Sequence, residues 1–252
     1  MEDQATLAYL NMFAVLGSLE NLTDLLPRAR EQVRTPKPVS VGFAVKDGPQ
    51  ATITFDDGHA RLTEGVDNCD VKLPFASPEK FNGLIDGTVT PVPSKGFTKI
   101  NFLLKQFTPL TETLEKYLRP DPKDLENRDF FEVSTKVMFY VIAAALSQVA
   151  NHDEVGRFSA AHTLDGDIAF GIKDGPQATI RVNAHHFQTI KEPCKEPRAV
   201  MEFESLDLAR ELFDGKVVAL ASIGTGQIAM RGMISMLDNL NRILDRVALY
   251  LA

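Results

Sequence analysis

The pattern of apolar and polar positions divides the chain into helical and extended segments that occur twice. Apolar residues recur at helical spacing over residues 5–24 and again over 130–151. Each stretch is followed by four segments rich in β-branched and aromatic residues, which are typical of strands. The predicted strands are 39–45, 51–56, 59–64 and 70–75 in the first half, and 167–172, 178–183, 186–191 and 198–203 in the second.

After the fourth strand, each half predicts a short helix. Ser77 and Pro78 form a helix cap followed by proline at the first helical position, and the helix ends at Gly87. The counterpart begins at Ser205 and ends at Gly215. The remaining predicted elements are fifth strands at 98–103 and 226–231 and closing helices at 109–118 and 233–250.

Two segments are predicted to be irregular. Residues 26–38 contain Pro27, Pro36 and Pro38, which oppose regular structure. Residues 119–129, RPDPKDLENRD, have the proline and charge content of an exposed hinge.

The heptapeptide KDGPQAT occurs at 46–52 and again at 173–179. A shift of 127 positions aligns 41–55 with 168–182, with nine of fifteen residues identical. With small shifts the alignment continues, and it pairs Gly96 with Gly224 and Ile100 with Ile228. We interpret KDGPQAT as a hairpin turn in which Gly48 and Gly175 supply positive φ; the alternative is an anion-binding turn.

The duplication predicts two tandem domains, residues 1–119 and 130–252, joined by a linker at 120–129. Short links between the strands favour antiparallel hairpins. The expected fold class is α+β, each domain being a five-stranded, mostly antiparallel sheet covered by helices.

Bulk composition narrows the function classes. The net charge of −7 and the pI of 5.3 argue against nucleic acid as a partner. Cys69 and Cys194 are the only cysteines, which favours a reducing compartment. The acidic N-terminus lacks the basic region of a secretory signal, and the longest apolar run, 137–146, is shorter than a bilayer requires. We expect a cytoplasmic protein.

No motif in the sequence indicates catalysis, a metal site or a cofactor. His185 and His186 adjoin, but neighbours on a strand point to opposite faces. His59 aligns with His186 at a predicted hairpin tip, where a surface turn is the simpler interpretation. GxSxG, HExxH and P-loop patterns are absent from the sequence. We therefore expect no enzyme, no catalytic residue, no metal ligand and no cofactor.

The closing helix of the second half carries an apolar stripe. Met233, Met236, Leu237 and Leu240 recur at helical spacing, and Met230 lies on the preceding strand. Methionine side chains adapt to varied apolar ligands, so the stripe fits a lipid cavity. Ordinary core packing is the alternative.

The order of elements resembles the sterol carrier protein type 2 family. The likeness is carried by FAVKDGPQATITFDDGHARLTEG and FASPEKFNGLIDG in the first half, and by FGIKDGPQATI, FESLDLARELFDGKV and GQIAMRGMISMLDNL in the second. The resemblance covers most of both halves and is one of fold-forming residues. It implies a tandem pair of sterol-carrier-like domains, each with an apolar tunnel between its sheet and its helices.

The resemblance further implies non-enzymatic binding and transfer of a fatty acid, acyl-CoA, sterol or phospholipid. The alternative is a protein-interaction or accessory module of lipid or isoprenoid metabolism with closed cavities. Partners would be a hydrophobic small molecule, at most a transient membrane contact, and a second copy or another protein. The expected lipid-binding residues are Phe170, Ile180, Phe203, Leu212, Phe213, Ile228, Met230, Met233, Met236, Leu237 and Leu240, with Phe43, Ile53, Phe81, Leu84, Ile100 and Phe102 in the first half.

The first half departs from this pattern after its predicted fifth strand. Leu104-Lys105 stands where the second half has Gly232-Met233, and the closing helix is shorter. The first tunnel is therefore less well supported than the second.

Residues 137–146, VMFYVIAAAL, are apolar on all sides of a helix. A helix that covers one sheet needs only one apolar stripe, so we expect this one to lie at a domain or subunit interface. The matching helix, with Tyr9, Met12, Phe13 and Leu16, offers a partner surface; membrane contact is the alternative.

Overall fold

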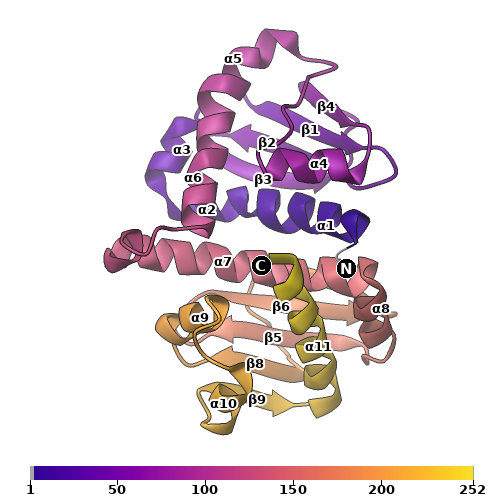
Figure 1. Ribbon diagram of the computed structural model, residues 1–252, viewed down its shortest axis with the longest axis vertical. Helices are drawn as coiled ribbons and strands as arrows, with labels where there is room; N and C mark the ends of the chain where they lie inside the picture. The colour runs from indigo at the N-terminus through magenta and orange to yellow at the C-terminus, as the bar shows by residue number, and fades with distance from the viewer. Residues whose placement is uncertain (1–2, 252) are drawn as a thin grey trace. The chain divides into compact units, whose positions relative to one another are not determined.

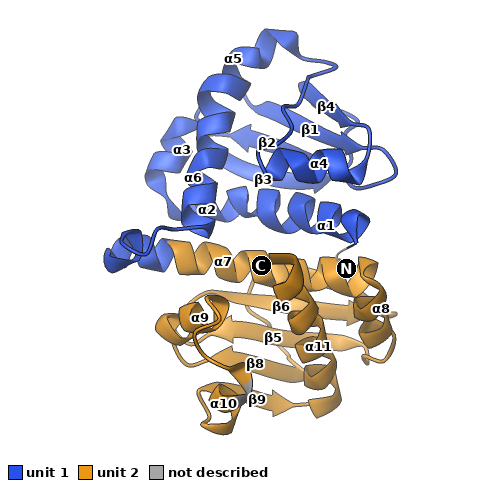
Figure 2. Ribbon diagram, in the orientation of Figure 1, with its two compact units in different colours: residues 1–133 blue, residues 134–252 orange. Residues whose placement is uncertain are grey.

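The computed structural model describes residues 3–251, which divide into two compact units after Val133 (Figure 2). The division lies inside a long helix that begins at Arg128, within the predicted linker at 120–129, so the last two residues of that linker are helical. Within that linker the short 3-10 helix η5 spans Asp124–Glu126. Each unit has the α+β architecture predicted from the sequence, one mixed sheet covered by helices.

The first unit begins with a helical run that is α-helical at both ends and has a π-helical turn and a 3-10 turn between them. The sheet follows, and then a second helical run closes the unit (Figure 1). The elements are α1 (Gln4–Leu10), η1 (Asn11–Val15), η2 (Leu16–Ser18), α2 (Leu19–Leu25), α3 (Pro27–Gln32), β1 (Val39–Val45), β2 (Gln50–Asp56), β3 (His59–Glu64), β4 (Val71–Phe75), α4 (Pro78–Ile85), η3 (Phe97–Lys99), α5 (Ile100–Phe102), η4 (Leu103–Phe107) and α6 (Thr108–Leu118).

The second unit repeats this order with longer regular elements. They are α7 (Arg128–His152), α8 (Glu154–Ala161), β5 (Gly166–Ile172), β6 (Gln177–Asn183), β7 (His186–Ile190), β8 (Ala199–Phe203), α9 (Leu206–Phe213), α10 (Ala219–Gly224), β9 (Ile228–Gly232) and α11 (Ile234–Leu251). In Figure 1, α9 and α11 lie in front of this sheet.

The two sheets are paired in the same way. Their strand orders are β3-β2-β1-β4 and β7-β6-β5-β8-β9, with one parallel pair in the first four strands of each. Gly42 lies opposite Thr52 in the first sheet, and Ala169 lies opposite Thr179 in the second. Ala169 and Thr179 each lie 127 positions after their counterparts, Gly42 and Thr52, which is the shift of the sequence repeat. The two units therefore share strand register as well as strand order.

The repeated heptapeptide forms a hairpin turn in both units, but not in the predicted conformation. Positive φ falls on Asp47 (56°) and Asp174 (54°), not on Gly48 and Gly175. Aspartate tolerates the left-handed region. Gly48 is needed for space, because an added Cβ would lie 2.8 Å from Cγ1 of Val45.

The predicted fifth strand at 98–103 is wrong for the first unit, where these residues are helical. Gly96 is the counterpart of Gly232, not of Gly224. Both have φ near 88° (87° and 88°), and an added Cβ on either would collide with the backbone that enters the fourth strand. The Lys72–Lys95 bridge corresponds to the Val200–Arg231 pair, and it is all that is left of the edge strand in the first unit.

Proline explains the lost strand. By this equivalence Pro91-Val92-Pro93 takes the place of the residues that begin β9 in the second unit. Proline has no N–H to donate to a ladder. As a result Val92 is 72% exposed, whereas its counterpart Ile228 is buried opposite Phe203. Gly96-Phe97, and not Leu104-Lys105, therefore corresponds to Gly232-Met233.

The prediction that residues 26–38 are irregular is also wrong in part. Pro27 stands at the first turn of α3, where its missing N–H costs nothing. The counterpart in the second unit is α8.

The longest helix, α7, packs on its own sheet. Phe139 stacks on Phe170 with ring centroids 5.1 Å apart, and Asn151 bonds to both backbone groups of Phe187. By length and composition α7 could cross a membrane, and 72% of its most apolar window is buried. A helix in the core of a compact domain can have the same length, composition and burial. The expected interface on its other face stays a prediction.

Candidate functional site

The residues expected to bind lipid in the second unit gather on the helix-covered face of its sheet. Phe170 lies beside Met201 in the parallel β5–β8 ladder, and the Phe203 ring meets Phe170 edge-on at 5.6 Å. Phe213, from the last turn of α9, meets Phe203 at 6.2 Å. The rings form a row that runs from under α7 to the end of α9.

The same face extends onto the edge strand and the closing helix. Ile228 lies opposite Phe203, and Met230 lies opposite Met201. The other expected residues on this side are buried: Ile180, Met236, Leu237 and Leu240.

Four of the expected residues are only half-buried, and they mark one end of this apolar interior. They are Leu212, Phe213, Met230 and Met233. Exposed apolar side chains lie close by in sequence, since Val218 is 70% exposed and Ile234 is 57% exposed. The ends of α9, β9 and α11 thus leave apolar side chains in contact with water.

The corresponding interior of the first unit is closed by aromatic side chains. Phe81 of α4 meets Phe43 at 6.3 Å and Phe75 at 5.2 Å, both edge-on. Phe55 meets two rings of the closing run, Phe102 at 5.4 Å and Phe107 at 6.0 Å. All six rings are buried. Ile53 is buried as well, whereas Leu84 and Ile100 are half-buried.

One pair of equivalent positions separates the two interiors most sharply. Helices α4 and α9 both have eight residues, begin after serine and end before an Asp-Gly pair with similar φ at the glycine. This equivalence places Ala209 where the first unit has Phe81, and both side chains are fully buried. The second unit therefore has a methyl group where the first has a ring in contact with two others.

Sequence reasoning missed three residues of this interior: Phe139, Met201 and Ala209. The sequence does contain a signal for Ala209: residues 71–87 can be aligned with 199–215, and this alignment sets Ala209 against Phe81. Phe139 was assigned to an interface, but it stacks on the sheet of its own unit.

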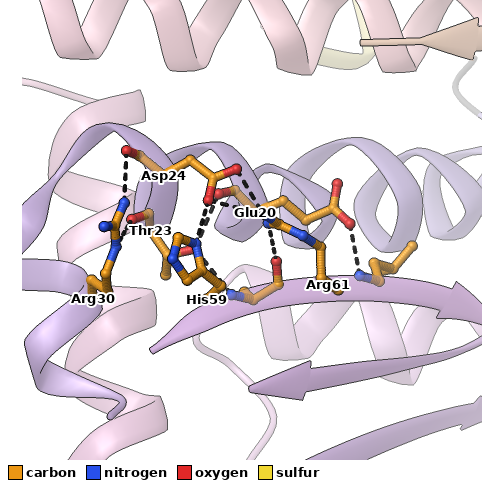
Figure 3. A network of polar contacts seen from close by, with 8 residues as sticks. Glu20, Thr23, Asp24, Arg30, His59 and Arg61 are labelled. Carbon is orange, nitrogen blue, oxygen red and sulfur yellow. Dashed lines mark hydrogen bonds and ion pairs between the residues drawn. The ribbon is translucent and has the colours of Figure 1, made fainter. Parts of the chain in front are cut away.

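The first unit also contains a dense polar cluster between α2 and the edge strand β3 (Figure 3). The Asp24 carboxylate lies 2.7 Å from Nδ1 of His59 and 3.2 Å from Arg61. Arg30 donates to the backbone oxygens of Thr23 and Asp24. His59 was predicted to be a surface turn residue, so its carboxylate partner is a finding of the tertiary structure.

This cluster anchors the edge strand. Thr23 Oγ1 accepts the Ala60 N–H at 3.0 Å, and Glu20 accepts the Leu62 N–H at 2.7 Å. Burial alone would raise the pKa of Asp24, but hydrogen bonds from His59 and Arg61 outweigh it and hold that pKa below its ordinary value. Arg61 is thus matched by a carboxylate that stays ionised, which fits a structural clamp rather than a proton shuttle.

A second clamp fixes the closing helix of the second unit. The nearly fully buried Asp153 accepts hydrogen bonds from Arg246 at 2.6 Å, from Tyr250 at 2.8 Å and from the Gly156 N–H at 2.9 Å. Burial would raise the pKa of Asp153, yet these donors lower it to about 2. One carboxylate therefore ties α11 to the junction of α7 and α8.

Other candidate chemistry is sparse. Within residues 3–251, no three His, Cys, Asp or Glu side chains cluster as metal ligands would. Cys69 is buried and Cys194 is half-buried, and both are free thiols. An open hollow of about 380 Å³ in the second unit contains none of the expected lipid-binding residues; it is lined by Thr163, Leu164, Asp165, Ala184, His185 and Arg198.

No protein-family model matches the chain, and neither does any curated protein. Solved structures similar to it include a UbiJ-SCP2 ubiquinone synthesis protein, with 14% identity over 42% of this chain and 95% of that one and a TM-score of 0.33. Domain 2 of the sterol carrier protein of Helicoverpa armigera has 14% identity over 43% and 87% of the two chains, with a TM-score of 0.36. A sterol carrier protein 2 has 18% identity over 44% and 92%, with a TM-score of 0.34.

Proposed function

We propose that the protein binds and transfers a hydrophobic small molecule, with an acyl chain or similar apolar body, in the interior of its second domain. The first domain serves as a closed companion module. In this proposal the two compact units are tandem sterol-carrier-like domains. The motifs KDGPQAT and SPxxF…DG, which resemble those of the sterol carrier protein type 2 family, support this organisation.

The exchange of Phe81 for Ala209 is the observation that carries this proposal. It removes a ring from the centre of the helix-covered face, next to a half-buried rim of Leu212, Phe213, Met230 and Met233. Four of the seven methionines lie on this sheet face, in the closing helix or directly before that helix: Met201, Met230, Met236 and Met233. Flexible thioether side chains can move aside for a ligand at little cost.

Such a site would select for apolar bulk more than for a head group. Transfer of each methylene from water gains about 0.8 kcal/mol, whichever lipid carries it. Within each of the clusters around Asp24 and Asp153, the carboxylate is paired with the cations and hydrogen-bond donors of the same cluster. The proposed site therefore includes neither cluster. No catalytic step, metal or cofactor is part of the proposal.

Ala209→Phe tests it directly. A phenyl ring at this position should fill the ligand space and weaken binding of a fluorescent fatty acid by about tenfold or more, while costing less than about 1.5 kcal/mol of stability. Probe titration and chemical denaturation of the full chain measure the two effects. Unchanged probe binding, or a loss of several kcal/mol in stability, would mean that the interior has no room for a ligand.

The closed-cavity alternative applies to the first domain, because six buried rings occupy its interior. Phe81→Ala there should not lower probe binding. If it did, the first domain and not the second would hold the ligand.

A further inference from the structure

The segment of the first unit that connects α4 to α6 differs in charge from the rest of the chain. The protein carries a net charge of −7, yet residues 87–111 contain Lys95, Lys99 and Lys105 and no aspartate or glutamate. The segment includes the helical run from Phe97 to Phe107 and forms the end of the unit around α5 in Figure 1.

The apolar side chains of this segment fall into two sets. Phe102 and Phe107 point inward and are 6% and 8% exposed, respectively. Phe97 and Leu104 are 62% and 64% exposed. These two side chains, seven residues apart in the helical run, therefore both face solvent. Val92, freed by the prolines that disrupt the edge strand, adds a third exposed apolar side chain in the same segment.

The lysines lie among these apolar residues. Lys95 and Lys105 are exposed and Lys99 is half-buried. Lys95 Nζ donates to the Cys69 carbonyl at 2.6 Å, which ties it to the protein. Among residues 3–251, neither Lys99 nor Lys105 has a carboxylate within ion-pairing distance. Two lysines without a carboxylate partner therefore lie in the same short segment as the exposed aromatic and aliphatic side chains.

We infer that this segment, through Val92, Phe97, Lys99, Leu104 and Lys105, docks the protein on an anionic lipid bilayer. Apolar side chains on a helix that lies in the membrane plane enter the boundary between head groups and acyl chains, and neighbouring lysines pair with anionic head groups. Exposed apolar side chains alone would fit a second protein equally well. The local excess of lysine in an acidic chain favours a negatively charged surface.

The rest of the chain sets the orientation. A protein of net charge −7 is repelled by an anionic bilayer wherever its acidic surface comes within about one Debye length, ~8 Å at physiological salt. A segment that carries three lysines and no aspartate or glutamate of its own can gain from approach. The inference does not rest on the proposed ligand site and holds even if the second interior is empty.

The absence of tryptophan from the chain provides a clean reporter. Phe97→Trp introduces a single indole at the exposed position. Its emission should shift to shorter wavelength when vesicles of mixed phosphatidylcholine and phosphatidylglycerol are added, and should not shift with phosphatidylcholine alone. High salt should reduce the shift, because it screens the lysines.

Charge variants locate the contact. Each lysine near an anionic membrane contributes about fivefold to binding, so Lys99→Gln with Lys105→Gln should weaken vesicle binding by about twentyfold. The matched control is Lys46→Gln with Lys173→Gln, which changes net charge equally in the exposed repeated turns. That control should change binding by less than about twofold.

An apolar pair completes the test. Leu104→Ser should weaken binding to the mixed vesicles, whereas Ile234→Ser, in the exposed start of the second closing helix, should not. All these positions are exposed except the half-buried Lys99, and circular dichroism should show unchanged folding for every variant. Equal losses in the two lysine pairs, or equal binding to neutral vesicles, would overturn the inference. So would an emission shift that depends on protein concentration without vesicles, since it would identify a contact between copies.

Discussion

The interiors of the two units differ although their sheets are paired in the same register. The first unit packs six phenylalanine rings between its sheet and its helices. In the second unit, Val182 replaces Phe55 and Ala209 replaces Phe81, and a methionine-rich rim stays partly exposed. Backbone pairing and interior volume are therefore separable: the strand ladders fix the first, and a few inward-facing side chains on the strands and covering helices fix the second.

The closing segments of the two units also differ, in the regularity of the edge strand and of the helix that follows it. The second unit has a regular edge strand and an 18-residue helix tied down by Asp153. In the first unit prolines disrupt that strand, and a helical run with 3-10, α and π turns follows. The unit with fewer rings in its interior thus has the more regular closing segment, and large apolar side chains are exposed in both units.

The largest expected effect comes from the ring that closes the first interior. Phe81→Ala should lower the free energy of unfolding of the first unit by about 3–5 kcal/mol, because it deletes a fully buried ring in contact with two others. Denaturant titration followed by circular dichroism measures it. A loss below about 1 kcal/mol would contradict the closed interior, and Ala209→Phe in the second unit is the reciprocal control.

Removing the clamp on the second closing helix should have the next largest effect. Asp153→Asn leaves Arg246 facing an amide in a buried site and should cost about 2–4 kcal/mol. Because the pKa of Asp153 falls from 3.8 to about 2 on folding, the wild-type stabilisation is present above about pH 4 and is lost as pH falls toward 2. Stability measured across this range should lose that pH dependence in the variant; an unchanged profile would refute the role of the clamp.

A charge introduced at the rim of the second unit should weaken ligand binding, whereas a charge at the equivalent position of the first unit should not. Met233→Glu places a carboxylate among half-buried apolar side chains and should weaken fatty-acid probe binding by about tenfold, or ~1.4 kcal/mol. The matched variant is Phe97→Glu, which occupies the equivalent position after Gly96 in the first unit. That variant should bind the probe normally, and equal losses in both would remove the distinction between the units.

The smallest expected effect concerns a feature that the two units share. Thr23 accepts one backbone hydrogen bond from the third strand, at Ala60, and Asn151 makes two with the equivalent residue, Phe187. Asn151→Ala should cost about 1 kcal/mol and Thr23→Ala about half of that. Hydrogen exchange at these edge-strand amides would measure the difference, and the reverse order would show that the anchors are not equivalent.

Much of the fold follows from local patterns. The alternation in 39–45 and 59–64 predicts strands with the bounds that β1 and β3 have, and SerPro at 77–78 and Gly87 delimit α4 within two residues. The error at 98–103 has a physical reason. Ile100 and Phe102 are residue types typical of strands. The segment equivalent to the edge strand, however, is the earlier one that contains Pro91 and Pro93, which cannot pair as a regular strand. The residues that follow form a helix, and Phe102 packs against Phe55.

The candidate site was predictable only in part. Phe170, Phe203 and Met230 share one face because strand parity dictates it, and parity can be read from the sequence. The pairing of Asp24 with His59 and of Asp153 with Arg246 could not be read in that way. Their members are 35 and 93 residues apart, and nothing local marks them as partners.

The sequence by itself therefore determined the duplicated element order, the position of the repeated hairpin turn and the apolar face of each sheet, because all three depend on periodicity and turn residues within short windows. Only the tertiary structure decided how the space over each sheet is filled, which carboxylates hold the helices, and which lysines and apolar side chains of the first closing segment face water. Those outcomes depend on volumes and charges brought together from distant parts of the chain, where one ring at Phe81 or one methyl group at Ala209 changes the result.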